Sequence, residues 1–186
     1  MSRHEYALAL ADERCESAMK ATASAPASTT LRVDLCMTWP GTVKSLIFTV
    51  PGQVMHKSTR KVVLAGADAV AFIADSQRSG ASANAYSWRD MEANLKSNGI
   101  DFDAIPKVVQ FNKRDLPDVK PLQEIRKAWG DVPTFPAVAI RGEGVVETFR
   151  ELLRLVYRRI DERHSFGIKF GVSEEDFLKG VLQSFG

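Results

Sequence analysis

The sequence has few of the residues that mark secreted, membrane-spanning or metal-binding proteins. It has only two cysteines, Cys15 and Cys36, whose separation matches no metal or redox motif and suits a reducing cytosol. Its three histidines are scattered along the chain. The longest apolar stretches, such as 69–74, are far shorter than the roughly 20 residues that span a bilayer, and no signal-peptide pattern opens the chain.

A charge excess is also absent. The chain has 25 Lys and Arg against 23 Asp and Glu, and the resulting net charge of +2 is too small to indicate a nucleic-acid partner. Charged residues make up 26% and apolar residues 45% of the 186, which is near the average of globular proteins. We therefore expect one globular domain with a sizeable core, located in the cytoplasm and without a membrane span.

Glycine is missing from the first part of the chain, where the first glycine is Gly41. No G-x-x-x-x-G-K-S/T pattern occurs anywhere in the sequence. In such a phosphate-binding loop, glycine N–H groups at a helix N-terminus hold the β-phosphate. A Lys neutralises phosphate charge, and the hydroxyl of a Ser or Thr ligates Mg²⁺. No other segment supplies this arrangement, so we expect any nucleotide to be bound weakly.

Strand-like and helix-like segments alternate, which predicts an α/β layer fold with a mostly parallel sheet. The predicted strands are 31–39, 44–50, 69–74, 107–111 and 135–140, the first two forming an antiparallel hairpin with its turn at Gly41. The predicted helices are 54–66 (a helix, or a turn and a helix), 88–98, 121–129, 145–163 and a short one at 174–182. We divide the chain into a divergent N-terminal segment (1–28), a core (29–164) and a C-terminal tail (165–186).

The most informative motif is Asn112-Lys113-Arg114-Asp115, which directly follows the apolar strand 107–111. A strand that ends in N-K-x-D resembles the guanine-reading loop of the Ras-like GTPases. A carboxylate at Asp115 can accept two hydrogen bonds from the N1–H and 2-amino groups of guanine, a pair that adenine lacks. Asn112 and Asp115 could instead simply cap the turn after the strand.

A second motif, Thr49-Val50-Pro51-Gly52-Gln53, follows the second strand. Most Ras-like proteins have D-x-x-G-Q here, and the threonine in the first position resembles the bacterial gliding-motility small GTPases of the MglA type, which set cell polarity. Further segments are similar to that family, so that the resemblance covers about residues 29–160. They are 58–61, 66–68, 72–77, 91–95, 109–117, 137–139 and 142–145.

The resemblance implies a Ras-like G-domain with the P-loop NTPase fold and a site for a guanine nucleotide, GTP or GDP. It implies base contacts from Asn112, Lys113 and Asp115. It also implies a backbone contact to the base from the loop that begins with Ala139 and Ile140. Arg141 stands where the family usually has a small or hydroxylated residue.

For the phosphate side, the resemblance implies that Gly52 senses the γ-phosphate and that Gln53 orients the attacking water. It implies a Mg²⁺ ligand at Thr30, and a roadblock-type partner that accelerates GTP hydrolysis by contacts near 54–61. Each assignment has an alternative. Pro51-Gly52 could form only a type II turn, Gln53 could be a surface residue, and Thr30 could belong to a linker rich in Ser and Thr.

In this family the first strand, the phosphate loop and the first helix come before Thr29, and here they are missing or replaced. That strand would lie between the strand ending at Val50 and the strand 69–74, so its loss should leave two sheet edges unpaired. The segment 5–11 could form a substitute strand or an Ala-rich helix. Two functions remain open: a small GTPase that hydrolyses GTP but is truncated in this sequence, or a pseudo-GTPase that serves as a protein-interaction module.

Overall fold

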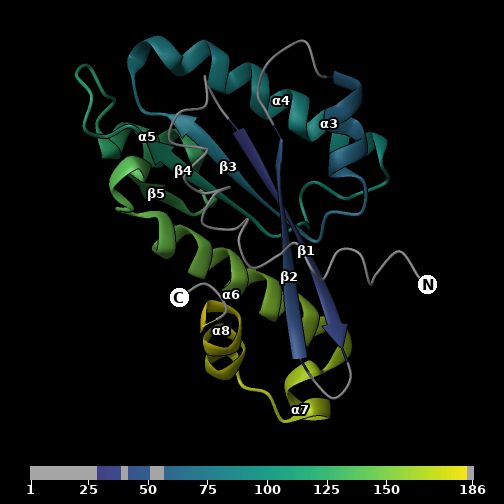
Figure 1. The fold of residues 1–186 in the computed structure, drawn as a ribbon. Helices are drawn as coiled ribbons and strands as arrows, with labels where there is room; N and C mark the ends of the chain where they lie inside the picture. Colours follow the sequence, from purple (N-terminus) through teal and green to yellow (C-terminus); the bar gives the residue numbers. More distant parts are fainter. Residues whose placement is uncertain (1–28, 39–41, 51–56, 184–186) are drawn as a thin grey trace.

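The computed structural model describes residues 29–38, 42–50 and 57–183, which form a five-stranded sheet with helices on both faces (Figure 1). The strands are β1 (Thr29–Thr38), β2 (Thr42–Val50), β3 (Ala69–Asp75), β4 (Lys107–Asn112) and β5 (Thr134–Pro136). The α-helices are α3 (Lys57–Leu64), α4 (Ala81–Ser97), α5 (Leu122–Trp129), α6 (Val145–His164), α7 (Phe166–Phe170) and α8 (Glu174–Gln183). Two short 3-10 helices, η2 (Arg78–Gly80) and η3 (Ala139–Arg141), complete the order. The predicted α/β class is confirmed.

The apolar strand β3 is buried on both faces because successive side chains of a strand point to opposite sides. On one side, Phe72 and its neighbours two residues away pack with side chains of α3, α4 and α5. On the other side, Ala71 and Ile73 pack with α6, α7 and α8. The result is three layers, helix, sheet and helix (Figure 1).

The strand order is β2-β1-β3-β4-β5, and β3, β4 and β5 run parallel to one another. β1 pairs with β2 as the predicted hairpin and also pairs antiparallel with β3, from Thr29 opposite Ile73 to Val33 opposite Ala69. The expectation of an unpaired edge on β3 was therefore wrong, since the hairpin itself fills the place beside it. The segment 5–11 lies outside the described residues.

This pairing brings one end of each of the five strands to the same edge of the sheet. β3 ends at Asp75, β4 at Asn112 and β5 at Pro136, and parallel strands end on the same side. The antiparallel β1 begins there, and β2 ends there with Val50 opposite Thr30. We call this side the carboxyl edge and the opposite side the amino edge. In open α/β sheets, ligands bind outside the carboxyl ends of the strands.

Several predicted boundaries differ from those observed. The predicted strand 135–140 was wrong beyond Pro136, because the chain turns there into η3. Helix α4 begins at Ala81 instead of 88, and α7 was not predicted. The side chains of Phe177 and Val181 on α8 are buried in the core formed with α6, while the division of the chain at residue 164 remains a prediction. Among the described residues, no helix is both long enough and apolar enough to cross a membrane.

Candidate nucleotide-binding site

Asn112 is the last residue of β4, and its side chain joins two loops of the carboxyl edge. It is only 3% exposed, and its Oδ1 accepts hydrogen bonds from the Lys113 N–H (2.8 Å) and the Ala139 N–H (2.8 Å). Buried backbone donors are costly to leave unpaired, so this amide holds the loop after β4 against the loop after β5.

Lys113 has a φ of 64°, in the left-handed region that few non-glycine residues adopt. Its Nζ lies 2.9 Å from Asp75 Oδ2, at the end of the neighbouring strand β3. The other oxygen, Asp75 Oδ1, accepts a hydrogen bond from the Gln77 N–H at 2.9 Å. The Lys113 side chain is thus held across the two strand ends.

Asp75 is itself fixed by Asn84 of α4. The Asp75 N–H donates to Asn84 Oδ1 (3.0 Å), and Asn84 Nδ2 donates back to the Asp75 carbonyl (2.8 Å). Gly80 lies against the same residue, since a Cβ at Gly80 would be 2.8 Å from Asp75 Cβ. Neither Asp75 nor Asn84 was expected from the sequence to have a role. The available signal was the position of Asp75 at the carboxyl end of a buried strand next to the N-K-x-D strand.

Asp115 is exposed, and its carboxylate makes no hydrogen bond or ion pair with the described residues. The backbone around it is fixed, because the Arg114 N–H donates to the Ala137 carbonyl (3.1 Å) and the Leu116 N–H to the Lys113 carbonyl (3.2 Å). Arg114 also donates through its guanidinium to the Lys120 carbonyl at 2.6 Å. The turn therefore presents a free carboxylate on a constrained backbone. A group that accepts hydrogen bonds from a ligand needs such a fixed position.

The loop after β5 begins with Ala137 and contains the two residues expected to approach the base. The Ala139 N–H is used by Asn112, and Ile140 is 77% exposed. Gly144, with a φ of 75°, ends this loop, and a Cβ there would lie 2.1 Å from the Pro136 carbonyl oxygen. Only glycine fits that position, so its backbone fixes how the loop enters α6.

The residues expected on the phosphate side are only partly described. Thr30 lies in β1 at the carboxyl edge, between Val50 of β2 and Phe72 of β3. Gly52 and Gln53 lie outside the described residues. Over the described ranges, no group of three or more His, Cys, Asp or Glu side chains could hold a metal ion. The roles of Thr30, Gly52 and Gln53 remain predictions.

Arg60, at the end of the predicted switch region, is buried in α3 with 4% exposure. Its NH1 lies 3.2 Å from Asp90 Oδ2 of α4, while Nε and NH2 have no hydrogen-bond partner among the described residues. A buried guanidinium depends strongly on such a carboxylate, because an unpaired buried charge is costly. This ion pair attaches the switch helix α3 to α4.

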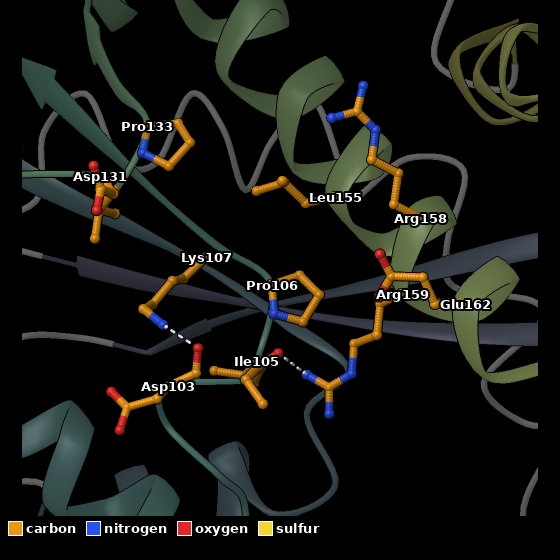
Figure 2. A pocket seen from close by; sticks show the side chains of 12 residues that line it. Asp103, Ile105, Pro106, Lys107, Asp131, Pro133, Leu155, Arg158, Arg159 and Glu162 are labelled. Carbon is orange, nitrogen blue, oxygen red and sulfur yellow. Dashed lines mark hydrogen bonds between the residues drawn. The ribbon is translucent and has the colours of Figure 1, made fainter.

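A hollow of about 690 Å³ lies at the amino edge, between the start of β4 and the second half of α6 (Figure 2). It is lined by equal numbers of cationic and anionic side chains over apolar ones. The charged ones are Lys107, Arg158, Arg159, Asp103, Asp131 and Glu162. Because these formal charges cancel, the hollow favours neither anions nor cations. We assign it no ligand.

An α/β fold with an N-K-x-D loop at the carboxyl ends of its parallel strands defines the class of the Ras-like G-domains. No family model matches the chain. The chain is 43% identical over 112 residues to the mutual gliding-motility protein MglA of Myxococcus xanthus (strain DK1622). The match covers 59% of this chain and 57% of that protein, so the chain spans little more than half the length of this relative. Over the aligned region, the chain is similar to the MglA type of Ras-like small GTPases.

Proposed function

We propose that this chain binds the guanine base of GTP or GDP through the loops after β4 and β5. The observation that carries the proposal is the exposed carboxylate of Asp115, which is unpaired within the described ranges and lies on a backbone held by Asn112 and its neighbours. Asp115 accepts the N1–H and 2-amino groups of guanine, which makes the site selective against adenine. The loop at Ala139 and Ile140 approaches the base from the other side, and Lys113 lies beside it.

The first test is a titration of the ¹⁵N-labelled chain with GDP, XDP and ADP, followed by backbone amide shifts. We expect GDP to shift the amides at 112–116 and 139–142, and ADP to leave them unchanged. Asp115→Asn should change the preference from GDP to XDP, because the amide of Asn donates a hydrogen bond where the carboxylate accepted one. Asp118→Asn, the same change three residues later at an exposed position, is the matched control. Equal shifts with GDP and ADP would reject the proposal.

We also propose the phosphate side that the MglA-type family implies. Gly52 approaches the γ-phosphate, Gln53 orients the attacking water and Thr30 ligates Mg²⁺. The proposed activity is GTP hydrolysis in a cytoplasmic protein that serves gliding motility or cell polarity. Its test is single-turnover hydrolysis with Mg²⁺. Gln53→Ala should slow the turnover without weakening GTP binding, and equal rates for the two proteins would reject the role of Gln53.

The alternative function is that of a pseudo-GTPase, an interaction module that does not hydrolyse GTP. The absence of a G-x-x-x-x-G-K-S/T loop from the sequence favours it, because that loop supplies much of the phosphate affinity in these folds. A titration with fluorescent GDP and GTP in Mg²⁺, with ATP as competitor, separates the two functions. Micromolar binding that resists ATP, together with turnover in the single-turnover assay, supports the GTPase. Folded protein that does not bind, or that binds without turnover, supports the pseudo-GTPase.

A roadblock-type protein is the proposed partner, with contacts near 54–61 at the switch. In the described part of this region, α3 is held to α4 by the Arg60–Asp90 ion pair, and Val62 on the same helix is 72% exposed. A purified roadblock-type protein should bind the chain, and Val62→Asp should weaken binding by burying a charge at the contact. Tyr86→Asp, at an exposed apolar residue of α4, serves as the control. An equal effect of both changes would speak against this surface.

A further inference from the structure

Asp75 lies outside the N-K-R-D motif, yet its side chain reaches the motif from the adjacent strand. Asp75 and Asn112 are directly paired residues of β3 and β4. Asp75 Oδ2 lies 2.9 Å from Lys113 Nζ, and the two side chains are only 11% and 26% exposed. The Ser76 N–H donates to the Asn112 carbonyl at 3.0 Å, so the two chain segments stay in contact beyond the strand ends.

The contact matters because Lys113 has the strained backbone conformation with a φ of 64°. A non-glycine residue keeps such a conformation only where its surroundings hold it. Two contacts do so: Asn112 Oδ1 accepts the Lys113 N–H, and the Asp75 carboxylate holds the far end of the side chain. The direction of the chain at Lys113 then determines where Asp115 lies.

Asp75 is well suited to this task because it is itself held. Its backbone makes a reciprocal pair of hydrogen bonds with the buried Asn84 side chain, and its second carboxylate oxygen accepts from Gln77. A group that positions another must have its own geometry fixed by its neighbours. The contacts therefore form a continuous series from α4 through Asp75 to Lys113.

We infer that Asp75 is a positioning residue for the guanine site: its carboxylate fixes Lys113, and through Lys113 the turn that presents Asp115. This inference rests on the proposed binding of guanine nucleotides. Its effect on affinity passes through the Asp75–Lys113 ion pair.

The test begins with Asp75→Asn, which keeps the shape and the acceptor for Gln77 but removes the charge. We expect GDP affinity to fall about tenfold, the usual effect of losing a hydrogen bond to a charged group. Asp118→Asn should leave GDP affinity unchanged. In a Lys113→Met background, Asp75→Asn should have no further effect, because the partner is already gone. The same tenfold loss in both backgrounds would overturn the inference.

A second readout needs no nucleotide. Asp75→Asn should speed the hydrogen exchange of the Arg114 and Leu116 amides, which bond to Ala137 and Lys113. The Val109 amide, bonded within the sheet to Pro133, should keep its rate. Lys113→Met, which removes the more exposed partner of the same ion pair, should change the exchange rates in the same way. Unchanged exchange at Arg114 and Leu116, or equal acceleration at Val109, would overturn the positioning role. A wild-type chain that fails to bind GDP would reject the proposed function but leave this readout intact.

Discussion

The two edges of the sheet both gather charged side chains, but they use them differently. At the amino edge, Lys107 donates to the Phe102 and Asp103 carbonyls (2.6 and 3.1 Å), and Arg159 donates to the Ala104 carbonyl. These cations stabilise the loop before β4. At the carboxyl edge, Asp75, Lys113 and Asn112 are likewise engaged with their neighbours, but Asp115 is not.

The proposed guanine site and the hollow lie at opposite edges of the sheet. The amino edge has the hollow of about 690 Å³, yet its cations bond to the chain's own backbone. Burial lowers the pKa of Lys107 and of Arg159, which reflects the cost of desolvating them there. Among the described residues, the carboxyl edge instead offers the free carboxylate of Asp115, on a loop that the hydrogen bonds of Asn112 and Arg114 hold in place. That combination is what selective recognition of a base requires.

The largest expected effect is at Gly144, where the carboxyl edge is most constrained. Gly144→Ala should lower the free energy of unfolding by about 3–5 kcal/mol, because its Cβ would overlap the Pro136 carbonyl at a positive φ. Gly142→Ala has a similar φ of 74° but open space around the Cβ, and should cost only about 1 kcal/mol. Urea unfolding of both variants measures the difference. Equal losses would mean that the loop after β5 can shift.

Asn112 comes next. Asn112→Ala leaves the N–H groups of Lys113 and Ala139 without their acceptor, and should lower the free energy of unfolding by about 2–3 kcal/mol. Asn98→Ala removes an exposed amide that bonds to the Lys61 carbonyl, and should cost less than about 1 kcal/mol. Urea unfolding measures both. A loss at Asn112 no larger than at Asn98 would show that the two loops are not joined by this side chain.

At the amino edge the expected effect is on stability alone. Lys107→Met removes the donor for two carbonyls and should lower the free energy of unfolding by about 1–2 kcal/mol, while GDP binding stays as in the wild type. Lys127→Met, at an exposed position of α5, is the control and should change neither quantity. The binding is measured by the amide titration described above. Weaker GDP binding by Lys107→Met would contradict the claim that the amino edge contributes to stability alone.

The smallest effect is a dependence on pH. Burial holds the pKa of Lys107 below its ordinary value of 10.5, so the folded chain releases this proton at lower pH than the unfolded chain does. Between the lowered pKa and 10.5 the unfolded state binds more protons, and stability rises with pH. The wild type should therefore gain stability relative to Lys107→Met as the pH rises toward 10.5. Thermal unfolding of the pair over this range measures the gain, and a constant difference would contradict it.

The sequence predicted those parts of the fold that local patterns determine. The continuous apolar run of β3 and the strand before Asn112 were located within one residue, because burial on both faces leaves a clear signal. The start of α4 was missed because Ala, Ser and Asn between 81 and 87 show no apolar periodicity. The chain after Pro136 was assigned to a strand because its residues are apolar, although the buried Val138 and Ala139 lie at the start of the 3-10 helix η3.

The site divides in the same way. Asn112, Lys113 and Asp115 could be proposed from the sequence because they belong to one short motif whose chemistry matches guanine. The contact between Lys113 and Asp75 was not found, because it joins residues 38 positions apart through the register of two strands. The pairing of β1 with β3 was missed for the same reason, since periodicity indicates a strand but not its neighbour.

The mixed sheet has a consequence for the kinetics of folding. The hairpin of β1 and β2 joins neighbouring strands, and isolated hairpins form in about 1–10 μs. The parallel pairs of β3, β4 and β5 need the crossovers that contain α4 and α5, so their contacts are distant in sequence and form slowly. Since β1 closes onto β3 with its first five residues, the hairpin can be complete long before it joins the sheet. We expect the β1–β3 contact to be a late event, and the preformed hairpin to be exposed to other chains until it closes.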